Sequence, residues 1–205
     1  MGLLEDKFRA IQFYKYFSRI YDYINPIFYS KQMRELVIEK AKIKNDSKIL
    51  EVGCGTGFTT EGIATKISEE SIFALDISRH QLSRAIRKFK KVNFILGDAE
   101  ALPFKDCSFD SVISAGSLEY WPNPKLGISE MARVTKSGGT IVVLVPRKPN
   151  NPVFKKVAES IMLFPSTEQC VQWFQHCGLE DIEVIETGPY SFWKKLVIII
   201  SAKVP

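Results

Sequence analysis

A glycine-rich turn between an apolar run and an amphipathic segment constrains this chain more than any other feature. The stretch covers residues 47–62, Ser-Lys-Ile-Leu-Glu-Val-Gly-Cys-Gly-Thr-Gly-Phe-Thr-Thr-Glu-Gly. Ile49, Leu50 and Val52 predict a short buried strand, and the spacing of residues 59–67 predicts a helix. Glycine is needed where the backbone turns tightly and a ligand approaches bare main chain. The pattern therefore predicts a nucleotide-type site at the carboxyl end of a parallel strand.

Acidic residues close the next two apolar runs. Asp76 ends the run 72–75 and lies about 20 residues beyond the glycines, the distance at which a carboxylate meets ribose hydroxyls. Asp98 follows the run 92–96, where a carboxylate can accept a hydrogen bond from an adenine amino group. The two residues predict an adenosine-binding site.

Glu51 and Phe58 distinguish between two kinds of ligand. A dinucleotide fingerprint requires glycine at position 58, which is Phe58 here, and Glu51 would repel a pyrophosphate. The same carboxylate would attract a ligand that carries an ammonium and a sulfonium. The motif therefore predicts S-adenosyl-L-methionine as the cofactor, with S-adenosyl-L-homocysteine as its product. The alternative is an ordinary strand-to-helix turn, because such turns commonly use glycine.

The residues expected to bind the cofactor lie in the glycine turn and directly after the following three strands. His80 comes just after the second strand, so we expect it on the ribose side rather than at the methyl acceptor. The expected cofactor-binding residues in this part of the chain are Glu51, Gly53, Cys54, Gly55, Thr56, Gly57, Asp76, Ile77, His80, Gly97, Asp98, Ala99, Glu100, Ala115 and Gly116.

These motifs resemble those of a known family. Glu51-Val-Gly-Cys-Gly-Thr-Gly57 resembles the first motif of class I methyltransferases, with Asp76 and Asp98 at the acidic positions of the second and third motifs. From about Phe13 almost to the C-terminus, the chain is similar to the 2-methyl-6-phytyl-1,4-benzoquinol methyltransferases of plastids and their prokaryotic relatives. The segments that carry this likeness are Gly97-Asp-Ala-Glu-Ala-Leu-Pro-Phe104, Ser114-Ala-Gly-Ser-Leu-Glu-Tyr-Trp-Pro-Asn-Pro124, Met162-Leu-Phe-Pro165 and Trp173-Phe174-Gln175.

Alternating strand and helix patterns predict an α/β fold. Strands are expected near residues 48–53, 71–76, 92–97, 109–115, 139–146, 180–187 and 193–203, and helices near 57–67, 78–90, 124–135 and 166–177. Such alternation builds a mostly parallel sheet covered on both faces. The resemblance implies the Rossmann-like class I methyltransferase fold, a seven-stranded, mostly parallel sheet with one antiparallel strand. A hairpin around Gly188-Pro189 places that strand at the end of the sheet.

The first 40 residues are unusually aromatic. Phe13, Phe17 and Tyr21 follow helical spacing, which predicts one or two amphipathic helices interrupted at Asn25-Pro26. The simplest interpretation is a helix whose apolar stripe packs on the core; the alternative is a lid over the site that also touches a lipid surface. We divide the chain into this N-terminal helical lid, 1–40, and a methyltransferase domain, 41–205. In related enzymes the element matching residues 21–25 closes over the cofactor, so the resemblance implies that Tyr21 is a cofactor or substrate contact.

The segment that follows the fourth predicted strand contains three candidates for contact with the acceptor. Methylation of a quinol ring carbon is assisted by removal of a phenolic proton, which requires a base or hydrogen-bond acceptor near the ring. Glu119 is the candidate catalytic residue, although a solvated loop carboxylate explains it equally well. Tyr120 and Trp121 are candidate substrate-binding residues, although aromatic side chains are often simply part of a core.

Composition excludes several classes of protein. The 205 residues carry a net charge of +5 without a single basic block, and 45% of them are hydrophobic, which suits one globular domain. Four cysteines without a C-x-x-C pair and two histidines predict neither a metal site nor a disulfide framework. The aliphatic runs are too short to span a bilayer, and the charged first ten residues are not a secretory signal. We expect a cytoplasmic protein, with peripheral contact to the inner membrane face through its aromatic N-terminus.

The resemblance implies C-methylation of a prenylated benzoquinol or naphthoquinol, or of a similar small lipophilic aromatic acceptor. Two alternatives stay open: methylation of RNA or protein, and a non-catalytic module that binds S-adenosylmethionine. The basic residues do not form a track interleaved with aromatic residues, so we expect no nucleic-acid partner. The sequence does not determine the oligomeric state.

Overall fold

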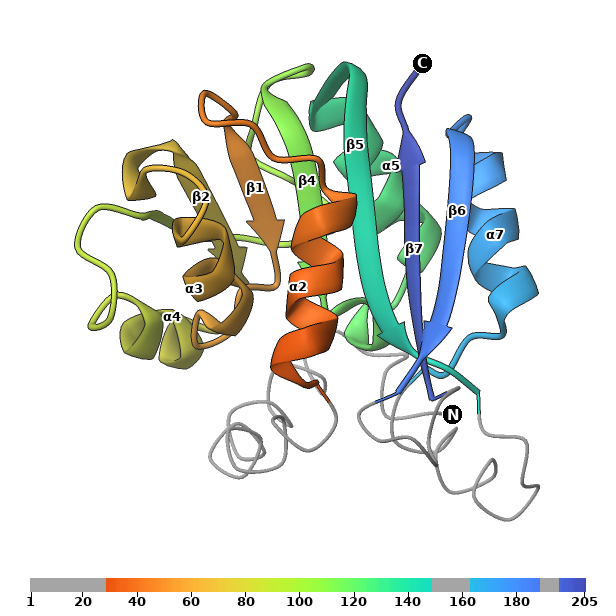
Figure 1. Ribbon diagram of the computed structural model, residues 1–205, viewed down its shortest axis with the longest axis horizontal. Helices are drawn as coiled ribbons and strands as arrows, with labels where there is room; N and C mark the ends of the chain where they lie inside the picture. Colours follow the sequence, from red (N-terminus) through yellow and green to blue (C-terminus); the bar gives the residue numbers. More distant parts are fainter. Residues whose placement is uncertain (1–28, 149–162, 189–195) are drawn as a thin grey trace.

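A seven-stranded sheet forms the centre of the molecule, with helices on both faces (Figure 1). The computed structural model describes residues 29–148, 163–188 and 196–205. In these ranges the strand order is β3-β2-β1-β4-β5-β7-β6. The strands are β1 (Ile49–Val52), β2 (Ile72–Asp76), β3 (Asn93–Leu96), β4 (Phe109–Ala115), β5 (Thr135–Pro146), β6 (Glu180–Thr187) and β7 (Val197–Lys203). Since β7 alone runs antiparallel to its neighbours, the predicted fold class is confirmed.

The sequence analysis placed the antiparallel strand at the end of the sheet, and this prediction is wrong. β7 is inserted between β5 and β6, and β6 forms the edge. The reason lies in the side chains: β7 reads Val-Ile-Ile-Ile and is buried on both faces, which suits an interior strand. β6 carries exposed or half-buried positions along its length, including Glu180 and Asp181, and charged residues protect an edge from further pairing.

Helices cover each face of the sheet. α2 (Lys31–Lys40), α3 (Phe58–Ala64) and α4 (Arg79–Ala85) lie on one face, and α5 (Pro124–Val134) and α7 (Thr167–His176) on the other (Figure 1). Two 3₁₀ turns, η1 (Glu69–Ser71) and η2 (Leu118–Tyr120), complete the described elements. α7 begins with a capping box between Ser166 and Gln169, which confirms the predicted helix start.

α4 ends earlier than the sequence predicted, at Ala85 rather than near residue 90. The chain continues as a turn, in which the N–H groups of Lys88 and Phe89 donate to the Ala85 carbonyl at 2.8 and 3.3 Å. Only Lys90 and Lys91 leave this pattern, and their N–H groups donate to the Glu69 carboxylate at 3.2 and 2.9 Å.

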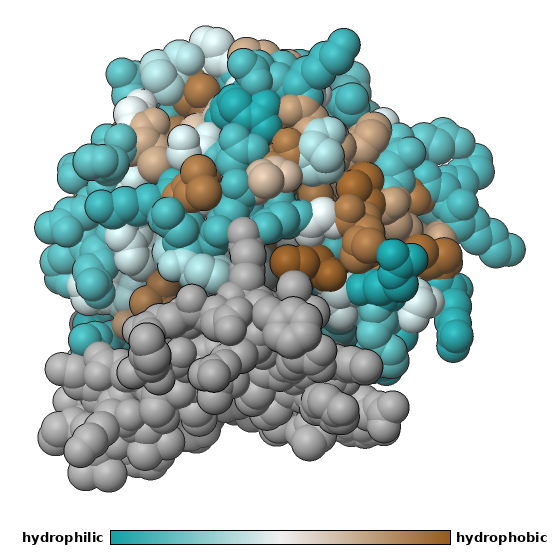
Figure 2. All heavy atoms as spheres, turned by 180° about the vertical axis from the view of Figure 1, so that it is seen from behind, coloured by the Kyte–Doolittle hydropathy of each residue, from teal (hydrophilic) through white to brown (hydrophobic). Residues whose placement is uncertain are grey.

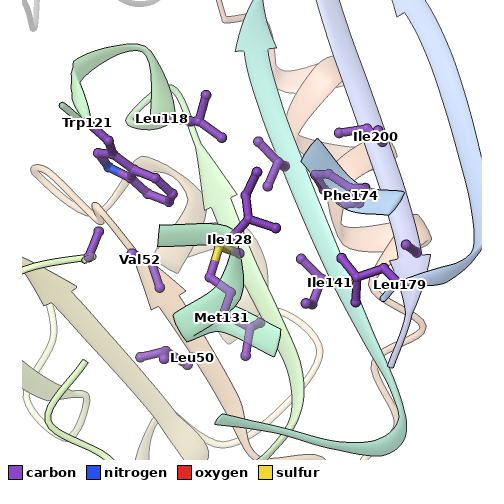
Figure 3. Packing of buried hydrophobic residues seen from close by; sticks show 14 of the residues in the cluster. Leu50, Val52, Leu118, Trp121, Ile128, Met131, Ile141, Phe174, Leu179 and Ile200 are labelled. Carbon is purple, nitrogen blue, oxygen red and sulfur yellow. The ribbon is translucent and has the colours of Figure 1, made fainter. Parts of the chain in front are cut away.

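Alternate residues of the strands fill two separate cores. In β5, Ile141 and Val143 pack toward α5 and α7, whereas Val142 and Leu144 pack toward α2, α3 and α4. Figure 3 shows the first core, where Ile128 and Met131 of α5 and Phe174 of α7 lie among Leu50, Val52, Ile141 and Ile200.

The described part of the predicted lid is helix α2, which packs on the sheet. Met33, Val37 and Ile38 are buried, and the Ser111 hydroxyl of β4 donates to the Ala41 carbonyl at 2.7 Å. Residues 1–28, which include Tyr21, lie outside the described residues, so the lid and the division at residue 40 stay predictions. In the described ranges, no helix is both long and apolar enough to cross a bilayer.

Candidate active site

A cavity opens at the carboxyl ends of the central strands. It is lined by residues that follow β1, β2, β3 and β4, together with Leu144 of β5 and residues of α2. Its space, with the open mouth included, is about 1190 Å³. β1 lies between β2 and β4, where the strand order reverses, and open α/β sheets bind ligands at this point.

The glycine turn after β1 takes a conformation that other residues rarely adopt. Gly53, Gly55 and Gly57 have φ angles of 77°, 54° and 88°. The N–H groups of Gly53 and Cys54 both donate to the Leu75 carbonyl of β2, at 2.7 and 3.0 Å. A Cβ atom at Gly53 would lie 2.2 Å from the Ser117 side chain, so glycine is required for the turn to pack against the segment after β4.

Asp76 organises the turn as well as lining the cavity. Its carboxylate accepts from the Gly55 N–H at 2.7 Å and from the Ser78 N–H at 2.8 Å. Burial raises the pKa of Asp76, while these two peptide hydrogen bonds act in the opposite direction. The carboxyl group therefore joins the loops after β1 and β2 at the cavity.

Glu51 is a buried carboxyl group that also lines the cavity. It is 2% exposed, and the Thr60 hydroxyl of α3 donates to its Oε2 at 2.5 Å. Burial raises its pKa to about 8, Thr60 lowers it, and the Asp76 charge raises it further. Among the described residues, no cationic side chain forms an ion pair with Glu51.

Aromatic and apolar residues also line the cavity. Tyr120 and Trp121 lie at the end of η2, and Tyr29 and Met33 come from α2 and the residues just before it. A Cβ atom at Gly127 of α5 would lie 2.4 Å from the Trp121 ring, so this glycine lets the ring pack closely on α5. Leu144 and Pro122 are further apolar residues of the lining.

Comparisons with known proteins identify the family. A family model described as "Methyltransferase domain" matches residues 50–143. Demethylmenaquinone methyltransferase of Staphylococcus saprophyticus is 32% identical over 218 residues, which cover 89% of this chain and 94% of that protein. The chain belongs to the S-adenosylmethionine-dependent methyltransferases.

Other relatives are more similar but longer. The 2-methyl-6-phytyl-1,4-hydroquinone methyltransferase 1 of Oryza sativa is 40% identical over 190 residues, covering 91% of this chain but only 58% of that protein. The chain thus spans less than two thirds of the length of this plant methyltransferase. Among solved structures, Haemonchus contortus phosphoethanolamine N-methyltransferase 2 in complex with S-adenosyl-L-methionine has a TM-score of 0.79. The match covers 96% of this chain and 60% of the Haemonchus chain. At 18% sequence identity, it shows a shared fold.

The residues of this methyltransferase fit its cofactor, S-adenosylmethionine. Glu51 is a buried carboxylate without a described cation, which is the group that a ligand ammonium stabilises. Asp76 and Asp98 line the same cavity and supply carboxylate oxygens for hydroxyl or amino donors. Gly55 has nothing within 4 Å of the position where a Cβ atom would lie, so the loop leaves open space beside it.

The structure brings most of the predicted site residues together. The expected residues that line the cavity are Glu51, Gly53, Cys54, Gly55, Thr56, Asp76, Ile77, Gly97, Asp98, Ala99, Glu100, Ala115, Gly116, Tyr120 and Trp121. Gly57 is not among the lining residues; it caps α3, and a Cβ atom there would lie 2.6 Å from the Phe89 ring. Tyr21 lies outside the described residues.

Two predicted residues lie away from the cavity wall. His80 is exposed on α4, because the cap at Ser78 turns the buried Gln81 toward the cavity instead. Glu119 does not line the cavity either, yet it is 1% exposed and therefore not a solvated loop carboxylate. The Tyr29 hydroxyl donates to its Oε1 at 2.8 Å. The catalytic role of Glu119 stays a prediction.

Sequence reasoning missed ten residues that line the cavity. Phe58 and Thr59 directly follow the glycine turn and Ser117 follows Gly116, so extending those motifs would have found them. Gln81 has a buried Oε1 without a described partner, and a helix-face argument from Ser78 would have suggested it. The residues without a local signal, which reach the cavity by folding, are Tyr29, Met33, Arg34, Leu75, Pro122 and Leu144.

Proposed function

We propose that the protein transfers a methyl group from S-adenosylmethionine to a ring carbon of a prenylated hydroquinone. The relatives in two groups support this acceptor class, since they are named 2-methyl-6-phytyl-1,4-hydroquinone methyltransferases and demethylmenaquinone methyltransferases. The observation that carries the proposal is that one cavity is lined both by carboxyl groups and by aromatic and apolar side chains. Such a cavity suits a charged cofactor beside a lipophilic ring.

The carboxyl groups and the aromatic residues of the lining have different roles. When bound, the cofactor supplies an electrophilic methyl carbon on a good leaving group, so the protein mainly has to align the partners and exclude water. Glu51 attracts the positively charged end of the cofactor, and Asp76 and Asp98 hold its adenosine. Tyr120 and Trp121 pack against the acceptor ring and hold its reactive carbon in line with the methyl group.

Transfer of labelled methyl to prenylated benzoquinols and naphthoquinols in detergent micelles tests the proposal. We expect label in a ring-methylated lipid, and we expect Asp76→Ala to abolish both transfer and calorimetric cofactor binding. Asp106→Ala is a matched control, because Asp106 is an exposed carboxylate bonded to Arg133. Cofactor binding without label in any lipid would contradict the proposed acceptor class.

We further propose that the protein works in the cytoplasm, at the inner membrane face, through its aromatic N-terminal segment. The support is the spacing of Phe13, Phe17 and Ile24 together with the lipophilic acceptor. Flotation of the full chain with anionic vesicles tests this, and we expect Phe17→Glu to reduce the bound fraction several-fold. Equal flotation of the two proteins would contradict it.

A further inference from the structure

Glu119 is a buried carboxyl group in an unusual setting. It sits in η2, four residues after the end of β4, and is 1% exposed. Its Oε1 accepts from the Tyr29 hydroxyl at 2.8 Å, and its Oε2 is buried without a partner among the described residues. A carboxyl group held in this way serves no ion pair in the described structure, and burying it has a free-energy cost.

Tyr29 connects this carboxyl group to the cavity. Tyr29 lines the cavity and Glu119 does not, so the Tyr29 side chain is shared between the two. A Cβ atom on Gly116 would lie 3.0 Å from the Tyr29 ring and 3.3 Å from its hydroxyl oxygen. Gly116 directly follows β4 and has a φ of 71°, so its missing side chain makes room for the Tyr29 ring and hydroxyl.

We propose that Tyr29 and Glu119 form a proton relay, in which the Tyr29 hydroxyl accepts the phenolic proton of the acceptor while donating its own proton to the Glu119 carboxylate. This proposal rests on the proposed function and specifies how the acceptor is activated. Tyr29 would touch the substrate and be catalytic, whereas Glu119 would act through Tyr29 as a positioning residue and final proton acceptor.

The relay balances the reaction. The phenol O–H bond breaks, and the electron pair left on oxygen makes the ring carbon nucleophilic. This carbon forms a bond to the methyl carbon, whose bond to the sulfonium sulfur breaks with its electrons remaining on sulfur. The C–H bond at the methylated carbon then breaks, its electron pair restores the aromatic ring, and its proton passes through water to the phenol oxygen. The original phenolic proton leaves Glu119 for solvent, so one proton is released per turnover.

The electrostatics of Glu119 suit this role. Burial raises its pKa to about 7, while hydrogen bonds from its own peptide N–H and from Tyr29 lower it. A base with a pKa near neutral pH works efficiently in general base catalysis. Arg34 also lines the cavity, but its guanidinium bonds the Phe58 carbonyl and the Glu61 carboxylate, and no described cation acts on Glu119. Because the carboxylate is the active form, activity should rise with pH through about 7.

A purely structural role for the same hydrogen bond makes different predictions. The Tyr29–Glu119 bond joins the start of α2 to η2, so breaking it could simply loosen the two elements. A structural pin would affect the melting temperature and KM, but it would leave the pH profile of kcat unchanged. The relay predicts that kcat falls and that the rise of kcat with pH through about 7, the acid limb of the profile, is lost.

The kinetic test compares Tyr29→Phe and Glu119→Gln with the wild-type enzyme. We expect kcat to fall roughly 100- to 10,000-fold in each variant, the typical contribution of general acid–base catalysis. We also expect the acid limb near pH 7 to disappear, while calorimetric affinity for the cofactor stays unchanged. Glu70→Gln is the matched control, because Glu70 is an exposed carboxylate bonded to Lys91 and should keep the wild-type profile. Wild-type kcat with an unchanged acid limb in both variants would overturn the relay.

A second readout does not depend on turnover. At pH 6, infrared difference spectra follow the protonated carboxyl band when a prenylated hydroquinone with a fully substituted ring binds. Glu51 is also protonated at pH 6, so the Glu119 component is the part of the band that Glu119→Gln lacks. We expect this component to shift in the wild type on binding and to stay in place in Tyr29→Phe. A bound hydroquinone that leaves the band unmoved would overturn the relay, even if other quinols are methylated. Absence of methylation for every quinol would contradict the proposed function, while the infrared response still decides the relay.

Discussion

Individual carboxyl groups carry most of the chemistry of this site. Glu51, Asp76 and Glu119 are all buried, and burial raises the pKa of each. Asp76 is satisfied by two peptide N–H groups, and Glu51 and Glu119 each receive one hydroxyl. None of the three forms an ion pair with a cationic side chain in the described part of the chain. A ligand with a positive charge or donor groups therefore has a large influence on their ionisation.

Cofactor affinity should therefore depend on pH through Glu51. Its pKa is raised to about 8, so at pH 6.5 binding of the cofactor ammonium must first remove a proton, whereas at pH 9 the carboxylate is already formed. We expect calorimetric affinity for S-adenosylmethionine to increase as pH rises through about 8, with protons released on binding at lower pH. Glu51→Gln should weaken binding by a factor of about 10 to 100 and remove this pH dependence. Proton release that persists in the variant would contradict the assignment.

At the scale of elements, the loops after β1 and β4 are fitted to each other. Gly53 and Gly138 have nearly equal φ angles of 77° and 73°, so a side chain is strained at either position. Only the surroundings differ: a Cβ atom at Gly53 would lie 2.2 Å from Ser117, whereas nothing lies within 4 Å at Gly138. Comparing an alanine substitution at Gly53 with one at Gly138 therefore separates the cost of backbone strain from the cost of overpacking.

Gly53→Ala should destabilise the protein more than Gly138→Ala. Both variants include the cost of a left-handed backbone, about 1–2 kcal/mol, and Gly53→Ala adds about 1–3 kcal/mol of overpacking. Urea unfolding of the two variants measures the difference directly. Equal losses would mean that Ser117 moves aside without cost.

How far the sequence predicted the site depends on how local each signal is. Asp76 and Asp98 were predictable because the motif and the strand it follows are adjacent in the chain. Tyr29 was not, since it precedes β1 by about 20 residues and reaches the cavity only when α2 packs on the sheet. The position of β7 between β5 and β6 was not predicted, because it follows from the burial of β7 on both faces of the sheet. The contact of Lys90 and Lys91 with Glu69 depended on a residue about 20 positions earlier in the chain.

At the scale of the whole molecule, the surface and the interior contrast in charge. The face shown in Figure 2 is largely hydrophilic, with hydrophobic residues in small groups. Exposed carboxylates such as Glu183 are bonded to lysines, which lower their pKa, whereas the interior carboxyl groups have raised pKa values. The two sets should therefore affect folding stability in opposite directions.

The buried carboxyl groups should make the ligand-free protein less stable as pH rises from about 5 to 8. The folded-state pKa of Glu119 is about 7, above the ordinary value of 4.5. Its contribution to stability is therefore complete below pH 4.5 and is lost as pH rises through 7, by about 3 kcal/mol. Glu119→Gln lacks this loss, so its free energy of unfolding, measured with urea, should rise relative to wild type between pH 5 and 8. A constant difference across this range would show that Glu119 ionises as readily in the folded state as in the unfolded one.

The position of β7 has a consequence for biosynthesis. β6 leaves the ribosome before β7, yet in the finished sheet β6 is joined to β5 only through β7. During translation, the outer edge of β5 has no partner strand until β7 is made, and β6 cannot yet join the sheet, whereas α7 can already pack against α5. A nascent chain stalled before residue 197 therefore presents an open aliphatic edge, and such edges are where chains associate wrongly. Demand for chaperones during synthesis should peak in this interval and end when β7 enters the gap.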